Sequence, residues 1–245
     1  MLCASQSCPI FMAAGLHSRR FWRIFGRLLP ISFCMVVIWQ IADRVPRRLW
    51  IASAILAGMG SLGILMRCTR DLSLWRNSQS QSSAPPSVWA AIREMATATR
   101  GMLGEERVAW LSTLPRVLFQ ESIALVHASP GTTWRAPGPE ASDEELKTAY
   151  GSLDRPIVVY GHIHRSFIRS IRHVRMEEIV VNTGSVSLSY DGDARAAYLL
   201  IDDSKPTIRR VEYDLEKELK TLSDCGLPHS DWVSKILRTR SPQLP

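Results

Sequence analysis

Two histidines separated by a single residue, His162 and His164, follow a short apolar run in this chain of 245 residues. The run is Ile-Val-Val-Tyr, which has the branching and length of a buried strand, and Gly161 then permits a turn. On an extended backbone, residues two apart point the same way, so both imidazoles can be directed at one point. Imidazole is the commonest metal ligand, so this spacing indicates a metal site. The alternative is one solvated histidine and one core histidine.

A third histidine, His127, ends a second apolar run over Ile123–Val126. If the two predicted strands converge at their ends, His127 lies beside the other two histidines and one site receives three neutral imidazole ligands. The remaining histidines occur in arginine-rich or polar surroundings, and we expect them at the surface: His17, His173 and His229.

The elements that must position these residues are predicted from Gly104 onward, where strand-length runs alternate with turn residues. The pattern favours a mixed α/β fold. The expected elements are a helix in 104–115, the strands before the histidines, a long polar connection that contains 143–153, further strands between 177 and 211 and a terminal helix before 222.

Four motifs, in this order, resemble the C-terminal half of the calcineurin-like metallophosphoesterases, especially the small bacterial branch. They are VHASP (126–130), GHIH (161–164), NTGS (182–185) and DGD followed by RAAY (191–198). The resemblance covers residues 104 to about 237, slightly more than half of the chain. It implies a two-sheet sandwich flanked by helices, of which we expect this chain to build one sheet clearly.

The resemblance also implies a site with two divalent cations, Mn, Fe or Zn, which lie between the sheets, are bridged by an aspartate and act on a small phosphoester substrate. It assigns His127 and His162 to one ion and His164 to the other. Asn182 and Ser185 border such a site and are candidate substrate contacts, although a glycine-bearing turn closing the strand is an equally good interpretation. No catalytic residue is identified. The DGD segment is best interpreted as a turn between strands.

Charge divides the chain into two unlike parts. Residues 1–100 contain 12 arginines, no lysine and three acidic residues, a balance of +9, whereas the rest holds 18 basic and 20 acidic residues, a balance of −2. The polar stretch 77–87 (NSQSQSSAPPS) is typical of a linker. We therefore predict an irregular or degenerate region at 1–100 and a metallophosphoesterase-like unit at 104–240.

The first region lacks the anionic ligands that the family supplies there in D-x-H, G-D and G-N-x-D motifs. Histidines alone leave the mutual repulsion of two divalent ions uncompensated, so we expect impaired metal binding and activity. One hypothesis is that this region is the family's N-terminal half translated in the wrong frame. The neighbouring frame admits Asp-Ile-His-Gly across 9–13, Gly-Gly-Asp across 35–38 and Gly-Asn-x-Asp across 62–66.

A membrane anchor and a non-catalytic binding module are the alternatives. Residues 49–66 form an uncharged run barely long enough to cross a bilayer, and arginines precede it. Nucleic-acid binding is disfavoured because the arginines are scattered among apolar residues rather than gathered with stacking aromatics. We expect a cytoplasmic protein acting on a small phosphoester, with membrane anchoring through 49–66 as the second choice.

Overall fold

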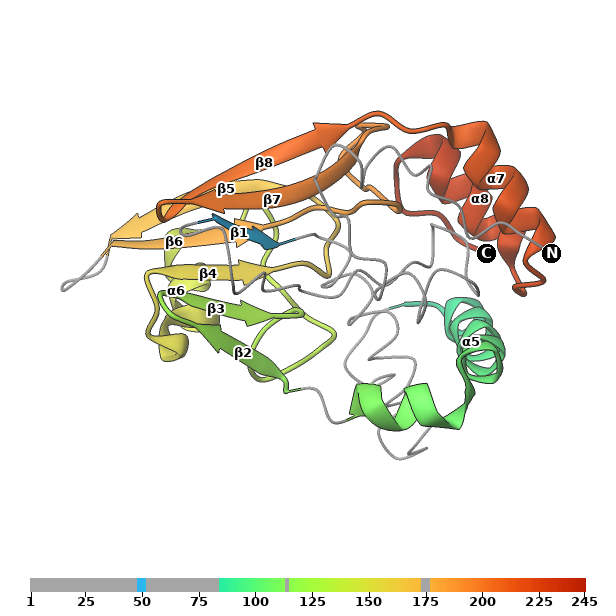
Figure 1. The fold of residues 1–245 in the computed structure, drawn as a ribbon, viewed down its shortest axis with the longest axis horizontal. Helices are drawn as coiled ribbons and strands as arrows, with labels where there is room; N and C mark the ends of the chain where they lie inside the picture. The colour runs from blue at the N-terminus through green and yellow to red at the C-terminus, as the bar shows by residue number, and fades with distance from the viewer. Residues whose placement is uncertain (1–47, 52–83, 113–114, 173–176) are drawn as a thin grey trace.

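Two β-sheets form the centre of the computed structural model, which describes residues 48–51, 84–112, 115–172 and 177–245 (Figure 1). The larger sheet has the strand order β2-β3-β4-β6-β5, and in the smaller one β7 lies between β1 and β8. The strands are β1 (Arg48–Ile51), β2 (Val117–Gln120), β3 (Ile123–Val126), β4 (Ile157–Tyr160), β5 (Phe167–Arg172), β6 (Glu177–Asn182), β7 (Ala196–Asp202) and β8 (Lys205–Val211).

The three central strands of the larger sheet, β3, β4 and β6, run parallel, and β2 and β5 flank them as antiparallel edges. Ile157 on β4 is level with Ile123 on β3 and with Ile179 on β6. The carboxyl ends of all three central strands therefore lie at one edge of the sheet. In Figure 1 that edge faces the end of the molecule occupied by α5, α7 and α8.

The principal core lies between the two sheets. Alternate side chains of β3, β4 and β6 pack against buried side chains of β7: Ile123, Leu125, Ile157, Val159, Val181, Leu199 and Ile201. All four residues of β3 and all four of β4 are buried. Both faces of these strands are covered, which explains why their sequences are continuously apolar instead of alternating.

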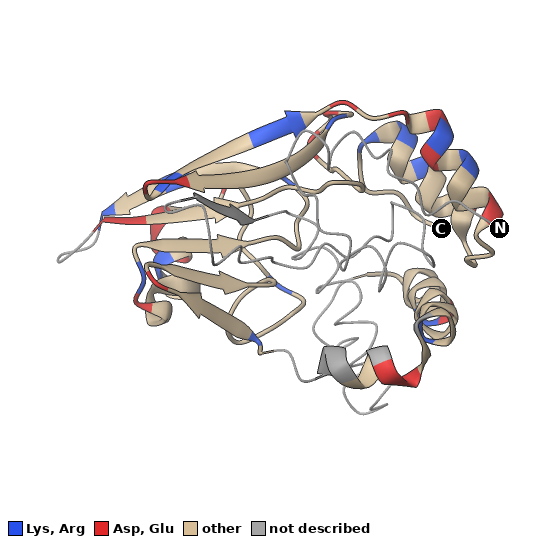
Figure 2. Ribbon diagram, in the orientation of Figure 1, with Lys and Arg blue, Asp and Glu red and all other residues tan. Residues whose placement is uncertain are grey.

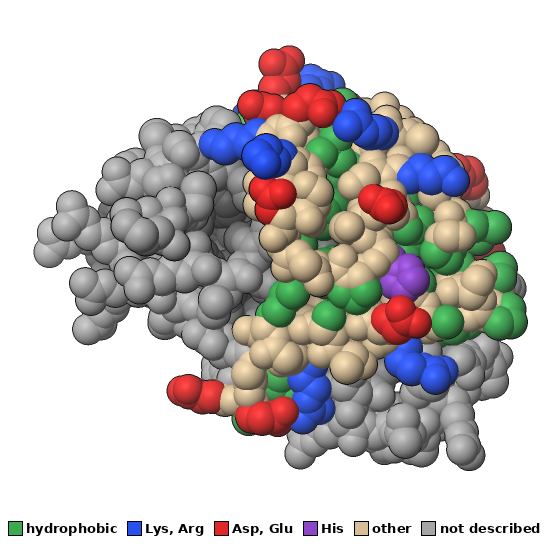
Figure 3. Space-filling view, turned by 90° about the vertical axis from the view of Figure 1, so that its right-hand side faces the viewer, with side chains coloured by type: hydrophobic (Ala, Val, Ile, Leu, Met, Phe, Trp, Pro, Cys, Tyr) green, Lys and Arg blue, Asp and Glu red, His purple; other side chains and the backbone are tan. Residues whose placement is uncertain are grey.

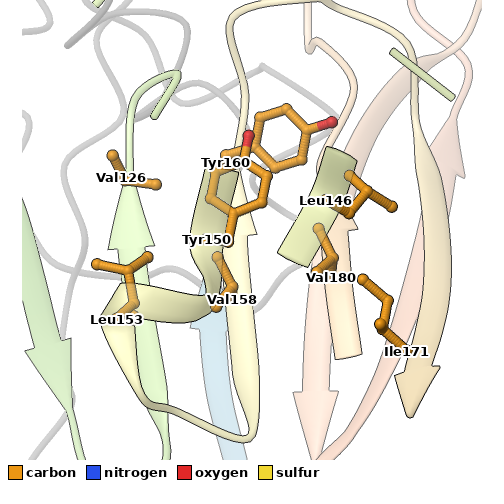
Figure 4. Packing of buried hydrophobic residues seen from close by; sticks show 9 residues of the cluster. Val126, Leu146, Tyr150, Leu153, Val158, Tyr160, Ile171 and Val180 are labelled. Carbon is orange, nitrogen blue, oxygen red and sulfur yellow. The ribbon is translucent and has the colours of Figure 1, made fainter. Parts of the chain in front are cut away.

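The opposite face of the larger sheet is covered by α6 (Asp143–Tyr150) and the short 3-10 helix η2 (Gly151–Leu153). Figure 4 shows this cluster, in which Tyr150 from α6 approaches Tyr160 from β4. Their ring centroids are 5.0 Å apart, and their hydroxyls donate to the carbonyls of Ala128 and Pro137. The two tyrosines thereby attach the loop after β3 to the sheet.

Three helices gather at the carboxyl end of the central strands: α5 (Pro86–Ser112), α7 (Leu215–Asp224) and α8 (Ser230–Thr239). They share a cluster of buried apolar side chains, Met95, Leu219, Leu222, Leu227, Val233 and Leu237. Their outer faces carry acidic and basic groups side by side (Figures 2 and 3), including the exposed pairs Lys220–Asp224 and Arg238–Glu216. Exposed pairs of this kind contribute little stability, because water screens them.

The expected two-sheet sandwich flanked by helices is confirmed, and the described chain builds both sheets rather than one. The sequence analysis missed β2, β5 and α8, and it interpreted residues 143–153, which contain α6, as a polar connection. Strand β5 has the sequence Phe-Ile-Arg-Ser-Ile-Arg, in which polar and apolar residues do not alternate, and as an edge strand it is exposed on one face. Helix α8 follows a left-handed residue, His229, whose side chain makes no cap, so its start has no sequence signal.

The proposed division near residue 100 falls within α5, which begins at Pro86 and has non-helical angles at Gly104 (φ 76°, ψ 159°). The linker residues 77–83 lie outside the described chain, and the division stays a prediction. Within the candidate membrane segment 49–66, residues 49–51 belong to β1 and residues 52–66 are not described. No helix in the described ranges is long and apolar enough to cross a bilayer.

Candidate metal centre

His127 and His162 stand at the carboxyl ends of neighbouring parallel strands. His127 directly follows β3, while Gly161 and His162 follow β4. The Gly161 N–H donates to the His127 carbonyl over 3.0 Å, which continues the β3–β4 pairing by one step beyond the strands. The parallel register therefore brings together two loops that are far apart in sequence.

The two imidazoles are in direct contact. His127 Nε2 lies 3.0 Å from His162 Nδ1, and the ring planes cross at 77°. His162 Nε2 lies 3.1 Å from the Trp134 carbonyl, which can only accept. His162 is therefore protonated on Nε2, and its Nδ1 accepts from the Nε2–H of His127. One proton therefore lies between His127 Nε2 and His162 Nδ1. A cation that binds both of these nitrogens would take the place of that proton.

His164 lies in a separate environment. Its Nδ1 donates to the Leu188 carbonyl over 2.7 Å, and its ring stacks on Tyr190 with centroids 4.9 Å apart. The side chain is buried, with 7% of its surface exposed. Because Nδ1 carries the proton, Nε2 carries the lone pair, and a backbone carbonyl that fixes the tautomer in this way is typical of the partners of metal-binding histidines.

We expected the two histidines of GHIH to point in the same direction because we assumed an extended backbone. That assumption is wrong. His162 and His164 have left-handed backbone angles, with φ of 51° and 56°, so the segment is not extended. The two side chains consequently have different hydrogen-bond partners, in the loops after β3 and β6. Left-handed angles are strained for histidine and occur preferentially at functional sites.

Burial keeps both histidines neutral. It lowers the pKa of His162, and the hydrogen bond to Trp134 opposes that effect only in part. Burial likewise lowers the pKa of His164 to about 4, against the opposing effect of the hydrogen bond to Leu188. A neutral imidazole is the form that binds a metal ion. At neutral pH a metal ion therefore does not have to displace the extra proton of an imidazolium.

Asn182 is the last residue of β6 and Ser185 follows it at the same edge, and both are buried. The Asn182 amide donates to the Gly161 carbonyl, and its oxygen accepts from the Gly184 N–H over 3.0 Å. The Ser185 hydroxyl accepts from the Ser187 N–H over 3.2 Å. These contacts connect the loop after β6 to the His162 loop. A role in binding substrate stays a prediction for both residues.

Sequence analysis missed an ionic cluster beside this loop, centred on Asp191 and Arg210. Arg210, on β8, contacts the Asp191 carboxylate with both guanidinium nitrogens. Burial raises the pKa of Asp191, but hydrogen bonds from Arg210 and Ser189 outweigh it and hold that pKa well below its usual range. The aspartate belongs to the DGD motif, so the motif does more than form a turn. Its partner lies on another strand, which no local pattern reveals.

The residues present fit part of a dinuclear centre. Two nitrogens 3.0 Å apart can both lie about 2.0–2.1 Å from one ion, and His164 Nε2 is available for a second ion. The described ranges contain no group of three or more His, Cys, Asp or Glu arranged to hold a metal, so neither His164 nor a carboxylate joins the His127–His162 pair there. The histidines therefore supply neutral ligands, without the negative charge that two adjacent cations require.

The order of the strands and the flanking helices give this chain a fold found in solved structures, one of which is a metallophosphoesterase. Two solved structures share it. One is a metallophosphoesterase from Sphaerobacter thermophilus, with a TM-score of 0.51 and 22% identity over 59% of this chain and 65% of that one. The other is a hypothetical protein from Pyrococcus horikoshii OT3, with a TM-score of 0.54 and 18% identity over 69% of this chain and 66% of that one.

These likenesses establish the fold. The chain spans less than two thirds of the length of either protein. No sequence-family model matches the chain, and no curated protein matches it.

Proposed function

We propose that residues 104–240 are the C-terminal half of a metal-dependent phosphoesterase with a dinuclear centre. The proposal rests chiefly on the contact between His127 and His162, made at the ends of two parallel strands in a metallophosphoesterase fold. His127 and His162 hold one divalent cation, Mn, Fe or Zn, and His164 contributes to the second. When bound, two such ions polarise a phosphoester and neutralise charge that develops during its hydrolysis.

The chain's own residues prepare this site in two ways. The carbonyls of Trp134 and Leu188 each accept a ring N–H, which leaves Nδ1 of His162 and Nε2 of His164 as the basic nitrogens. Burial keeps both rings neutral, so they add no positive charge beside a cation. The substrate in this proposal is a small phosphoester, and the location is cytoplasmic.

The same site is impaired in this chain, in our proposal, because anionic ligands are missing. Residues 1–100 contain none of the D-x-H, G-D or G-N-x-D motifs, and in the part of the chain that the structure describes no group of three or more His, Cys, Asp or Glu is arranged to hold a metal. Coulomb repulsion between two divalent ions is then offset by nothing in the site. We expect one ion to bind weakly and phosphoester turnover to be negligible.

A non-catalytic binding module is the second candidate. It is favoured by the same lack of a carboxylate cluster, together with a complete core between the two sheets. A membrane-anchored version depends on residues 49–66, most of which are outside the described chain.

Metal titration separates the two candidates. The full-length chain, freed of metal by chelation, is titrated with MnCl₂ and ZnCl₂ by calorimetry, beside His127→Ala and a surface control, His229→Ala. His229 pairs with Glu94 and takes no part in the site. Binding that is lost in His127→Ala and kept in His229→Ala supports the metal centre, whereas equal binding by all three proteins contradicts it.

Sequencing the gene tests the frame hypothesis. The codons for residues 9–13, 35–38 and 62–66 should encode Asp-Ile-His-Gly, Gly-Gly-Asp and Gly-Asn-x-Asp in the neighbouring frame. A gene with that frame restored should give a protein that hydrolyses p-nitrophenyl phosphate or its diester with added Mn²⁺, while the present chain should not. An absence of these codons, or strong turnover by the present chain, would refute the hypothesis.

A further inference from the structure

The loop of residues 185–193, between β6 and β7, contacts His164 in three ways. The Leu188 carbonyl accepts from its Nδ1 over 2.7 Å, and the Tyr190 N–H donates to its carbonyl over 3.0 Å. The Tyr190 ring also stacks on the imidazole, with an angle of 30° between the planes. One loop thus fixes the backbone, the ring plane and the protonated nitrogen of His164.

Asp191 attaches this loop to two other elements. Its carboxylate accepts from Ser166, just before β5, over 3.2 Å and forms an ion pair with Arg210 on β8. Arg210 Nη2 in turn donates to the Ser166 hydroxyl over 2.6 Å. Less than one fifth of either charged side chain is exposed, so water screens the pair little. The three side chains form a closed triangle of charge-assisted hydrogen bonds.

Asp191 is adjacent to Tyr190 and three residues from Leu188, so its attachment determines where both contacts of His164 lie. Ser189 Oγ donates to the same carboxylate, which holds the intervening turn. Without the carboxylate, Arg210 and Ser166 lose their common acceptor, and the 185–193 loop is left with the longer ion pair between Asp193 and Arg210, at 3.5 Å, as a link to β8. The Leu188 carbonyl is then free to move away from the imidazole.

We propose that Asp191 and Arg210 are positioning residues that, through Leu188 and Tyr190, hold His164 as the Nδ1–H tautomer with its Nε2 lone pair available to a divalent cation. The cation is the part that rests on the proposed function. The tautomer is a property of the metal-free protein and is measured by itself.

The test is nitrogen NMR of ¹⁵N-histidine-labelled full-length chain at neutral pH in the presence of a chelator. In the natural protein, His164 should give one signal from a protonated Nδ1 and one from an unprotonated Nε2. In Asp191→Asn, which keeps the shape but removes the charge, the Nδ1 signal should shift toward the unprotonated position as the two tautomers mix. The matched control is Asp224→Asn, which breaks the exposed pair with Lys220 and should leave His164 unchanged.

Arg210→Lys is the second variant. Lysine keeps the charge but lacks the planar fork that reaches Asp191 and Ser166 together, so a smaller shift of the same sign is expected. Circular dichroism confirms the fold of each variant, and Arg210→Lys decides the matter if Asp191→Asn does not fold. A His164 tautomer that is unchanged in the folded variants overturns the proposal.

Mn²⁺ titration of the same proteins then tests the step to the metal. Asp191→Asn should weaken binding about tenfold, the lower end of the range for residues that orient a ligand indirectly. If the tautomer depends on Asp191 while the natural protein binds no Mn²⁺, the positioning role stands and the proposed metal centre fails. If the natural protein binds Mn²⁺ but the His164 tautomer does not depend on Asp191, the proposed metal centre stands and the positioning role fails.

Discussion

His127 Nε2 and His162 Nδ1 lie 3.0 Å apart although 35 positions separate the two residues in the chain. The contact exists because β3 and β4 are adjacent and parallel, so their carboxyl ends coincide. In the metal-free protein one ring donates to the other, and in the proposed metal-bound protein both nitrogens face the cation. The pair therefore links the stability of the apo protein to its proposed function.

A double-mutant cycle measures this pair. In chelator, His127→Leu should destabilise the protein by about 1–3 kcal/mol, because His162 Nδ1 loses its donor in a partly buried place. The double variant His127→Leu/His162→Leu should be more stable than the sum of the single effects implies, by about 0.5–3 kcal/mol. Urea unfolding provides the free energies. A cycle between His127 and the distant His229 is the control and should be additive.

Gly184 tests how closely the loop after β6 must approach its neighbours. Its φ is +75°, and an added Cβ would lie 2.9 Å from Ser166 Cβ and 3.1 Å from Ala197 Cβ. Gly192 has a similar φ of +81° but open space around it. Gly192→Ala should cost about 1–2 kcal/mol from backbone strain alone, and Gly184→Ala should cost about 1–3 kcal/mol more from the steric overlap.

Urea unfolding measures both variants. Equal losses of unfolding free energy in Gly184→Ala and Gly192→Ala would show that Ser166 leaves room for a Cβ at position 184. A larger loss in Gly184→Ala should also be accompanied by a change in the His164 resonances, since Ser166 bonds Asp191 in the loop that holds this histidine.

The Asp191–Arg210 pair predicts an acid-sensitive stability. The pKa of Asp191 is lower in the folded protein than the value of about 3.9 expected when unfolded, so the unfolded state binds the proton more readily. The stabilisation is therefore complete above about pH 5 and is lost progressively as the pH falls below about 4. Urea unfolding between about pH 6 and pH 3 should show this loss, reduced in Asp191→Asn.

Asp224→Asn is the control for this pH series. Its carboxylate is exposed and paired with Lys220, so its removal should leave the acid sensitivity nearly unchanged. An identical decline in the natural protein and in Asp191→Asn would assign the acid sensitivity to other groups.

Trp89 should connect α5 to the site. It is 4% exposed, and its ring lies 4.9 Å from that of Trp134, whose carbonyl accepts from His162. Trp89→Ala should destabilise the protein by about 3–5 kcal/mol through the cavity it leaves. Trp89→Phe keeps an aromatic edge and should lose less. Thermal and urea unfolding measure both, and a loss below about 1 kcal/mol in Trp89→Ala would mean that α5 does not rely on this contact.

Local sequence was sufficient for the central strands and for the identity of the candidate ligands. Strands β3 and β4 are buried on both faces, so their residues are apolar without interruption, and the histidines follow at once. Edge strand β5 was missed, because Ile168 lies on its exposed face and Arg169 on its half-buried face, so its sequence shows no apolar alternation. The sequence signal is strong where burial is complete and weak where half of the side chains contact water.

Tertiary structure alone decided which ligands meet. The histidine pair spans 35 positions and depends on strand order, which no local pattern encodes. Alternation suggested one common direction for His162 and His164, but left-handed backbone angles give them different partners. The Asp191–Arg210 pair likewise joins a loop to a strand 19 positions away. Side-chain type is a property of the sequence, whereas the direction in which a side chain points is determined by backbone angles and strand pairing that only the folded chain possesses.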